Sequence, residues 1–320
     1  MIKRMQLLLT GCAGFIGAKV TELLLKSGHT VVGIDNLNDY YDVKIKEFRL
    51  NALQQLQGNW NFVQGDIEDK TCLEQVFKTY TFDAVYHIAA RAGVRASMET
   101  PHVYYTTNVL GGLNLLECMC QTHVRKLIAI STSSLYSGQP MPFVETSPVN
   151  EPISPYAASK KAAEMLYYTY HHLYGIDVSI LRCFTVYGPN GRPDMSPDRF
   201  MRCIASGKPI QLNGDGTQSR DFTFVDDIAR GIIAAQKPLG YEVINLGNHQ
   251  PHTINEMIGL LEKYLNKKAT IVHHPFNASD MMHTYASIEK AQQLLGWTPK
   301  IPLEEGLQKM IEGTRFLAHP

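Results

Sequence analysis

A tyrosine and a lysine four residues apart are the side chains in this sequence best suited to acid–base chemistry. Tyr156-Ala157-Ala158-Ser159-Lys160 opens a segment with helical apolar spacing, just after Pro152 and Pro155. Residues i and i+4 share one helix face, so the ammonium of Lys160 can lie beside the phenol of Tyr156. A nearby positive charge lowers the pKa of a phenol from about 10, which makes Tyr156 a candidate base near neutral pH. Taken alone, the same spacing is more typical of an ordinary amphipathic helix.

Four hydroxyl side chains stand ahead of that helix, at the end of a predicted strand over 126–130. They are Ser131-Thr132-Ser133-Ser134, and the carboxyl end of a strand is where open α/β sheets bind ligands. We expect Thr132 to hydrogen-bond the substrate hydroxyl that reacts, with Ser133 and Ser134 as further contacts. The other interpretation of these residues is a hydroxyl-rich turn or a helix cap.

The first elements of the chain are predicted to be a strand, a glycine turn and a helix. Gly11, Gly14 and Gly17 form a GxxGxxG pattern after the short apolar run at 5–9. Gly11 permits a tight turn, Gly14 lets the backbone approach a pyrophosphate, and Gly17 lets helix and strand pack closely. The alternative is an exported protein lipidated at Cys12, but secretory signals need an apolar run of about 7 to 15 residues. The pattern therefore favours a dinucleotide site.

Acidic and small residues at the ends of the next strands support this interpretation. A second predicted strand, 30–35, ends in Asp35, whose carboxylate can bond a ribose diol and would repel a 2′-phosphate. This favours NAD over NADP as the cofactor. Asp66 and Ile67 follow the third strand and can face the adenine, and Ala89-Ala90 follow the fourth, where small side chains leave room for the cofactor.

Strand-like runs at 62–64, 84–87, 126–130 and 178–182 alternate with helical spacing, which predicts an α/β fold with a doubly wound parallel (Rossmann) sheet. Turn-rich segments at 187–194 and 212–217 follow. We therefore expect an NAD-binding domain at 1–181. Residues 182–320 should form mainly a smaller mixed α/β C-terminal substrate lobe, with a segment near 222–247 returning to the first domain.

The composition is that of a soluble globular protein. The 320 residues carry 30 basic and 30 acidic side chains, so no overall charge favours nucleic acid or a membrane surface. The six cysteines lack metal-ligand spacing, and adjacent histidine pairs do not point the same way. We expect reduced thiols, no metal site and a cytoplasmic location.

Together these motifs resemble the extended short-chain dehydrogenase/reductase superfamily, in its nucleotide-sugar branch. The resemblance spans nearly the whole chain and includes the glycine pattern, Asp35, Tyr-x-x-x-Lys and the run 181–189. The stretches 35–42, 92–95 and above all Gly191-Arg192-Pro193-Asp194-Met195 are similar to those of UDP-glucuronate 4-epimerases.

The resemblance implies NAD as cofactor, a UDP-sugar as substrate and a set of site residues. Its catalytic residues would be Thr132, Tyr156 and Lys160. The cofactor residues would be Gly11, Gly14, Phe15, Ile16, Gly17, Asp35, Asn36, Asn38, Asp66, Ile67, Ala89, Ala90, Arg91, Tyr156 and Lys160. The substrate residues would be Arg95, Ser133, Ser134, Thr185, Arg192, Gln211, Arg220 and Asp280.

Each of these groups has an expected task. Arg192 and Thr185 are candidates to bind the uronate carboxylate, and Arg220 is the candidate to bind the diphosphate. Gln211 would bind the uridine, and Asp280 would bind its ribose. Lys160 would bond the nicotinamide ribose, and an oxidised nicotinamide would reinforce the positive charge beside Tyr156. The expected reaction is C4 epimerisation through a 4-keto intermediate.

Several alternatives remain open at this point. A UDP-glucuronate decarboxylase and other UDP-sugar 4-epimerases share the same oxidation, although relatives that decarboxylate usually carry a carboxylate at the position of Ser134. A 4,6-dehydratase usually has Asp-Glu where Ser133-Ser134 stand. A non-catalytic NAD-binding regulator would usually lack the tyrosine or the lysine. The resemblance also suggests a homodimer formed by the helices near 98–122 and 156–174.

Overall fold

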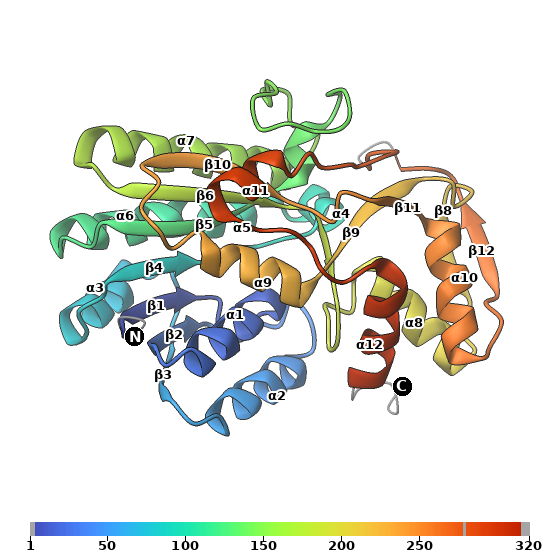
Figure 1. Cartoon of the computed structure of the whole chain (residues 1–320), viewed down its shortest axis with the longest axis horizontal. Coiled ribbons are helices and arrows are strands. Elements are labelled where there is room, and N and C mark those ends of the chain that lie inside the picture. Colours follow the sequence, from blue (N-terminus) through green and yellow to red (C-terminus); the bar gives the residue numbers. More distant parts are fainter. Residues whose placement is uncertain (1–3, 278–279, 315–320) are drawn as a thin grey trace.

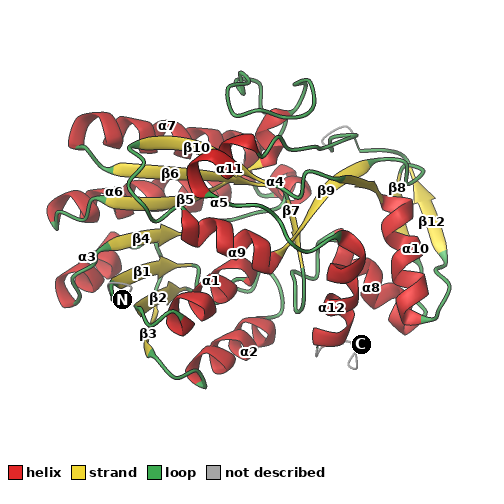
Figure 2. Cartoon of the chain, in the orientation of Figure 1, coloured by secondary structure: helices red, strands yellow, loops and turns green. Residues whose placement is uncertain are grey.

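The computed structural model, which describes residues 4–277 and 280–314, is built around a seven-stranded parallel sheet. Its strand order is β10-β6-β5-β4-β1-β2-β3, and all its neighbouring strands are parallel (Figures 1 and 2). The strands are β1 (Gln6–Thr10), β2 (Thr30–Asp35), β3 (Asn59–Gln64), β4 (Ala84–His87), β5 (Lys126–Thr132), β6 (Asp177–Cys183) and β10 (Tyr241–Leu246). The predicted doubly wound α/β fold is confirmed.

Helices cover both faces of this sheet. One face carries α1 (Phe15–Lys26), α2 (Val43–Gln54), α9 (Val225–Ala234) and α11 (Glu289–Leu295), and the other carries α3 (Lys70–Thr79), α6 (Gly111–Gln121) and α7 (Pro155–Tyr174) (Figure 1). Because successive strand residues point to opposite faces, Leu7 and Leu9 pack into one core and Leu8 into the other. A parallel sheet buried on both faces needs such continuous apolar strands.

Short helices fill the connection between β4 and α6. They are α4 (Val94–Glu99), α5 (Pro101–Tyr105) and a π-helical turn, η1 (Thr106–Leu110). On the next connection, β5 leads into a 3₁₀ turn, η2 (Ser133–Tyr136), and α7 begins only at Pro155. The side chain of Ser154 caps α7 by accepting a hydrogen bond from the backbone N–H of Ala157, and Gly175 ends the helix with φ of 66°.

The remaining elements form a smaller lobe at the carboxyl edge of the sheet. This lobe contains β7 (Thr185–Tyr187), α8 (Ser196–Ser206), β8 (Ile210–Asn213), β9 (Ser219–Phe224), β11 (Pro251–Thr253), α10 (Ile254–Leu265), β12 (Ile271–His274) and α12 (Leu303–Gly313) (Figure 2). It holds a three-stranded sheet, β11-β9-β7, and a two-stranded sheet, β12-β8, around a third core.

The chain passes between the large sheet and the smaller lobe more than once. It leaves the large sheet after β6, returns through α9 and β10, and enters the lobe again at β11. The predicted boundary at 181/182 lies within β6, and the division into domains stays a prediction. Residues 1–3 and 315–320, which the predicted domains include, lie outside the described residues.

All six cysteines are free thiols. Within residues 4–277 and 280–314, no helix has the length and apolar character needed to cross a membrane.

Candidate active site

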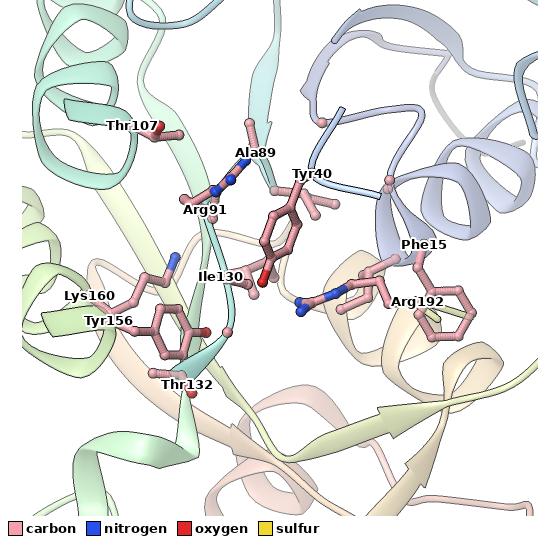
Figure 3. A pocket seen from close by; sticks show the side chains of 18 of the residues that line it. Phe15, Tyr40, Ala89, Arg91, Thr107, Ile130, Thr132, Tyr156, Lys160 and Arg192 are labelled. Atoms are coloured by element: carbon pink, nitrogen blue, oxygen red, sulfur yellow. The ribbon is translucent and has the colours of Figure 1, made fainter. Parts of the chain in front are cut away.

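A cavity of about 480 Å³ opens at the carboxyl edge of the large sheet (Figure 3). The glycine turn after β1, the loops after β2, β3 and β4, the end of β5, the start of α7 and the segment after β6 all contribute to its walls. All fifteen predicted cofactor residues line it. So do five other predicted residues, which are Thr132, Ser133, Ser134, Thr185 and Arg192.

The glycine turn has space only for glycine at two of its positions. Gly11 has φ of 75°, and a Cβ atom there would lie 2.7 Å from the backbone nitrogen of Ala89. A Cβ on Gly17 would lie 2.0 Å from the carbonyl oxygen of Gly11. Helix α1 can therefore begin close against β1, with its free N–H groups and positive dipole end directed at the cavity. This arrangement fits a dinucleotide pyrophosphate.

Side chains from neighbouring loops are fixed beside this turn. Asp35 accepts hydrogen bonds from the backbone N–H groups of Ala13, at 3.0 Å, and Leu37, at 2.9 Å. Asn36 donates to the carboxylate of Asp66 at 2.7 Å and accepts from Asn38 at 2.8 Å. These bonds hold two carboxylates at the edge of the cavity, where they can accept hydrogen bonds from the ribose hydroxyls and the exocyclic amino group of an adenosine.

Tyr156, Thr132 and Lys160 lie together on the wall opposite the glycine turn (Figure 3). Burial raises the pKa of Tyr156, and a hydrogen bond with Thr132 and the positive charge of Arg192 oppose that rise. In the chain alone, burial outweighs these two groups. The lowering expected from Lys160 together with an oxidised nicotinamide stays a prediction. Burial also lowers the pKa of Lys160 to about 8, with Glu164 acting in the opposite direction.

Arg192 reaches the cavity beside a tyrosine that the sequence analysis did not single out. Its guanidinium binds both carboxylate oxygens of Asp194 and lies 5.6 Å from the ring centre of Tyr40. Arg91 stacks on Tyr40 at 3.9 Å. Figure 3 shows Tyr40 between these two arginines. Together they make the middle of the cavity positively charged and aromatic.

Four predicted substrate residues do not line the cavity and lie on the smaller lobe and α4. Arg95 forms an ion pair with Asp280 at 2.6 Å. Burial lowers the pKa of Arg220, and the charges of Arg95 and Asp280 also act on it. Arg199 donates a hydrogen bond to the backbone carbonyl oxygen of Gln211 at 3.3 Å. We call Arg95, Arg199, Gln211, Arg220 and Asp280 the arginine cluster.

Arg199 was missed by the sequence analysis. Its pKa is lowered by burial and by Arg95, and its Nε atom is buried without a hydrogen-bond partner in the part of the chain that the structure describes. Three arginines face one aspartate here, so the cluster suits a doubly charged anion such as a diphosphate. A short-range motif could not reveal Arg199, since its neighbours come from three separate segments.

Two other residues position the cavity walls and were also missed. Asn108, in the π-helical turn η1, bonds both backbone groups of Arg91 and donates to Ser159 at 2.9 Å. Arg49, on α2, donates to the carbonyl oxygens of Ala13 and Asn190. The first joins the β4 loop to α7, and the second joins the glycine turn to the loop of Arg192. π-Helical turns are frequent at functional sites, but the sequence shows no period that predicts one.

In the described ranges, no three histidine, cysteine, aspartate or glutamate side chains form a group that could hold a metal ion. The groups that line the cavity are a phenol, an ammonium, hydroxyls, guanidinium groups and the glycine cradle. Fold and site together define a dinucleotide-dependent enzyme acting at an alcohol.

Comparison with known proteins identifies the family. The model for the family described as GDP-mannose 4,6 dehydratase matches residues 8–310. A UDP-glucuronate 4-epimerase from Thermodesulfobacterium geofontis is 54% identical over 309 residues, which cover 96% of this chain and 95% of that protein. The chain belongs to the GDP-mannose 4,6 dehydratase family, of the extended short-chain dehydrogenase/reductase type.

Solved structures agree with this assignment. The UDP-glucuronic acid 4-epimerase of Bacillus cereus, in complex with UDP-glucuronic acid and NAD, superimposes with a TM-score of 0.91 at 37% identity. The alignment covers 96% of this chain and 98% of that one. A UDP-glucose 4-epimerase from Thermotoga maritima with UDP-glucose has a TM-score of 0.86 at 32% identity, over 96% and 98% of the two chains.

Proposed function

We propose that this chain is an NAD-dependent UDP-glucuronate 4-epimerase, which interconverts UDP-glucuronate and UDP-galacturonate. The observation that carries the proposal is the placement of Tyr156, Thr132 and Lys160 on one wall of a cavity whose opposite wall is a glycine cradle. The similarity to UDP-glucuronate 4-epimerases over nearly the whole chain supports the substrate. Residues 1–181 bind mainly NAD, and residues 182–320 bind mainly the UDP-sugar.

Each reacting group has a task in this proposal. Tyr156, as the phenolate, accepts the proton of the C4 hydroxyl when the alcohol is oxidised and returns it when the 4-keto sugar is reduced on its other face. The positive charges of Lys160 and of a bound oxidised nicotinamide would offset the burial that raises the pKa of this phenol. Thr132, which lines the same wall of the cavity as Tyr156, holds the reacting oxygen, and Lys160 supplies a positive charge beside the phenol. NAD, bound over the glycine turn, accepts the hydride from C4 and gives it back, so it is not consumed.

The arginine cluster holds the diphosphate while the sugar ring turns between the two half-reactions. Anchoring one end of the substrate keeps C4 near the cofactor in both orientations, which is a positioning contribution to the rate. Arg95 and Asp280 lie at the same end, where the uridine and its ribose extend onto the smaller lobe.

The uronate carboxylate distinguishes this substrate from a UDP-hexose. Thr185, Ser133, Ser134 and Arg192 line the same cavity and offer hydroxyl and guanidinium donors to it. A 4-keto uronate loses CO2 easily when the bond between C5 and its carboxylate is parallel to the π orbitals of the C4 carbonyl. Donors that fix the carboxylate out of that alignment therefore suppress decarboxylation.

Two further properties belong to this proposal. The protein is cytoplasmic, since its six cysteines are free thiols. It is also a homodimer, with the outer faces of α4 to α7 as the interface. Exposed apolar side chains on these elements, including Met165 and Tyr168, support the assignment of this surface as the dimer interface.

The test is incubation of the purified protein with UDP-glucuronate and no added NAD, followed by proton NMR of the sugar nucleotides. We expect UDP-galacturonate to form from the cofactor that copurifies with the protein. A UDP-pentose as the only product would instead identify a decarboxylase. No reaction, with or without added NAD, would favour a non-catalytic role.

Tyr156→Phe separates these outcomes further. Removing the phenolic oxygen should lower kcat by about 10²- to 10⁴-fold, the usual contribution of a general acid–base group, while the bound NAD content stays the same. Tyr170→Phe makes the same chemical change on the same helix, outside the cavity, and should leave kcat unchanged. Equal rates in both variants would contradict the role given to Tyr156.

A further inference from the structure

One buried carboxylate next to the candidate catalytic residues has no place in the mechanism above. Glu164 lies one helical turn after Lys160 on α7, and its side chain is 4% exposed. It does not line the cavity. A carboxylate is expensive to bury unless it is paired and hydrogen-bonded, so its partners show what it holds.

Both oxygens of Glu164 are occupied. Arg182, on β6, donates from Nε to Oε1 at 2.9 Å and from Nη2 to Oε2 at 2.7 Å. Ser131, on β5, donates to Oε1 at 2.6 Å. Ser131 is the residue before Thr132, and Arg182 is the residue before Cys183, which lines the cavity. Glu164 thus ties the helix of Tyr156 and Lys160 to the ends of the two strands that face them.

Arg182 is itself fixed on its other side. Its Nη1 donates to the hydroxyl of Tyr136 at 2.9 Å, and its guanidinium lies 4.9 Å from that ring centre. Tyr136 in turn donates to Asn245, on β10, at 2.8 Å. The ion pair therefore belongs to a continuous buried network that reaches across three neighbouring strands, β5, β6 and β10. Such a network can hold a side chain in a single position.

The surroundings of Lys160 explain why a carboxylate is needed there. The titratable groups that face its ammonium are Glu164 on its own helix, Cys183 on β6 and His87 on β4. Burial raises the pKa of Cys183 to about 12 and lowers that of His87 to about 3, so neither carries a charge near neutral pH. Glu164 is then the anion that favours the charged form of Lys160, whose pKa burial lowers to about 8.

We infer that Glu164 is a positioning residue for the reaction, which holds α7, and with it Tyr156 and Lys160, against Ser131 and Arg182. Arg182 in turn fixes the orientation of the carboxylate through two hydrogen bonds. This inference rests on the proposed function for its link to catalysis, but the effect of Glu164 on Lys160 belongs to the protein alone and can be measured without substrate.

The test follows the titration of Lys160 directly. Protein labelled with ¹³Cε-lysine is titrated by NMR, and the Lys160 signal is assigned by its loss in Lys160→Arg. In Glu164→Gln the midpoint should fall by about one pH unit or more relative to the wild type. The alkaline limb of the kcat profile for UDP-glucuronate should move to lower pH by the same amount. Glu164→Asp, which keeps the charge, should stay close to the wild type.

A double variant separates this role from simple pairing with Arg182. Glu164→Gln leaves a buried guanidinium without its partner and can lose stability for that reason alone. Glu164→Gln/Arg182→Gln removes both charges, so it should regain stability and still show the lowered Lys160 midpoint. If the double variant recovers the wild-type midpoint and pH profile as well, Glu164 has only a structural role and the inference is overturned.

The two proposals can fail separately. A wild-type chain that does not epimerise UDP-glucuronate contradicts the proposed function, whereas the NMR midpoint of Lys160 still decides the inference about Glu164. An unchanged midpoint in Glu164→Gln overturns the inference even where the wild type is an active epimerase.

Discussion

At the scale of single residues, the candidate site places a buried charge where folding alone would not place one. Lys160 is 6% exposed and has a pKa of about 8 in the folded chain, against an ordinary value of 10.5. The lower value means that the folded state holds the ammonium less favourably than water does. Groups kept at such a cost are typical of functional sites.

We therefore expect Lys160→Met to be inactive and more stable than the wild type. The difference between 10.5 and about 8, at about 1.4 kcal/mol for each pKa unit, gives a gain of up to about 3.5 kcal/mol in the free energy of unfolding at pH 7. Between pH 8 and 10.5 the unfolded chain binds the proton more tightly than the folded one, so wild-type stability rises with pH there.

Urea unfolding from pH 7 to 10.5 checks this prediction. The variant lacks the titrating group, so its advantage should shrink as the pH rises and vanish near 10.5. Lys161→Met, which changes the neighbouring lysine on the same helix, is the control. A Lys160→Met variant less stable than the wild type at every pH would contradict the prediction.

The sequence indicated which residues line the cavity better than it indicated their pKa values. Tyr156, Thr132 and the glycines could be found because their spacing is local and their chemistry is distinctive. The direction of the Tyr156 pKa could not be found, because it depends on burial by segments far away in the chain. The sequence did not indicate Arg199 or Glu164 for a related reason, since their partners lie on other strands and helices.

At the scale of elements, the turn between β1 and α1 shows how local sequence sets the cavity. The close approach of α1 to β1 leaves no room for a side chain on Gly17, whose Cβ would meet the carbonyl oxygen of Gly11. Any widening of the turn would move the first N–H groups of α1 away from a bound pyrophosphate.

Gly17→Ala should therefore lose both stability and cofactor. We expect the free energy of unfolding to fall by about 1 to 3 kcal/mol, as for other overpacked sites, and the protein to purify without NAD. Gly259→Ala is the matched control, because a Cβ on this glycine of α10 would meet nothing within 4 Å. That change should stabilise the chain by up to about 1 kcal/mol. Normal NAD content in Gly17→Ala would contradict the role given to the turn.

Elements with a strong period were predictable and short ones were not. The runs predicted at 84–87 and 178–182 correspond to β4 and β6, and the run at 62–64 is the end of β3. The succession α4, α5 and η1 has no such signal, since each piece has only five or six residues. Its conformation depends on tertiary contacts, such as those of Asn108 with Arg91 and Ser159.

At the scale of the whole molecule, the cavity lies where two parts of the chain meet. The return of β10 to the large sheet and the ion pair between Arg95 and Asp280 both join segments far apart in the sequence. Alternation of strands and helices predicts a doubly wound sheet, but it cannot specify a contact between residues 185 positions apart. The arginine cluster is therefore a property of the fold and could only be suggested by family resemblance.

The outer surface of the α7 side carries the clearest sign of assembly. Met165 and Tyr168, on α7, are 52% and 47% exposed, and Tyr105 and Leu110, on elements that pack beside α7, are also exposed. Large apolar side chains gathered on adjacent helices are typical of a subunit interface. In a twofold-symmetric dimer the same surface meets its own copy, so one substitution changes the interface twice.

Met165→Glu should therefore dissociate the proposed dimer. Two carboxylates brought into an apolar interface lose their hydration without gaining a partner, and we expect the dimer dissociation constant to rise by at least about 100-fold. Sedimentation velocity would then show the wild type at twice the 35.9 kDa chain mass and the variant at the chain mass.

Val272→Glu, which adds the same charge at an exposed position on β12, should stay dimeric. Because Met165 lies on the helix of Tyr156 and Lys160, kcat measured on the monomeric variant would also show whether the catalytic helix needs its partner. A wild type that sediments at the chain mass would contradict the proposed dimer.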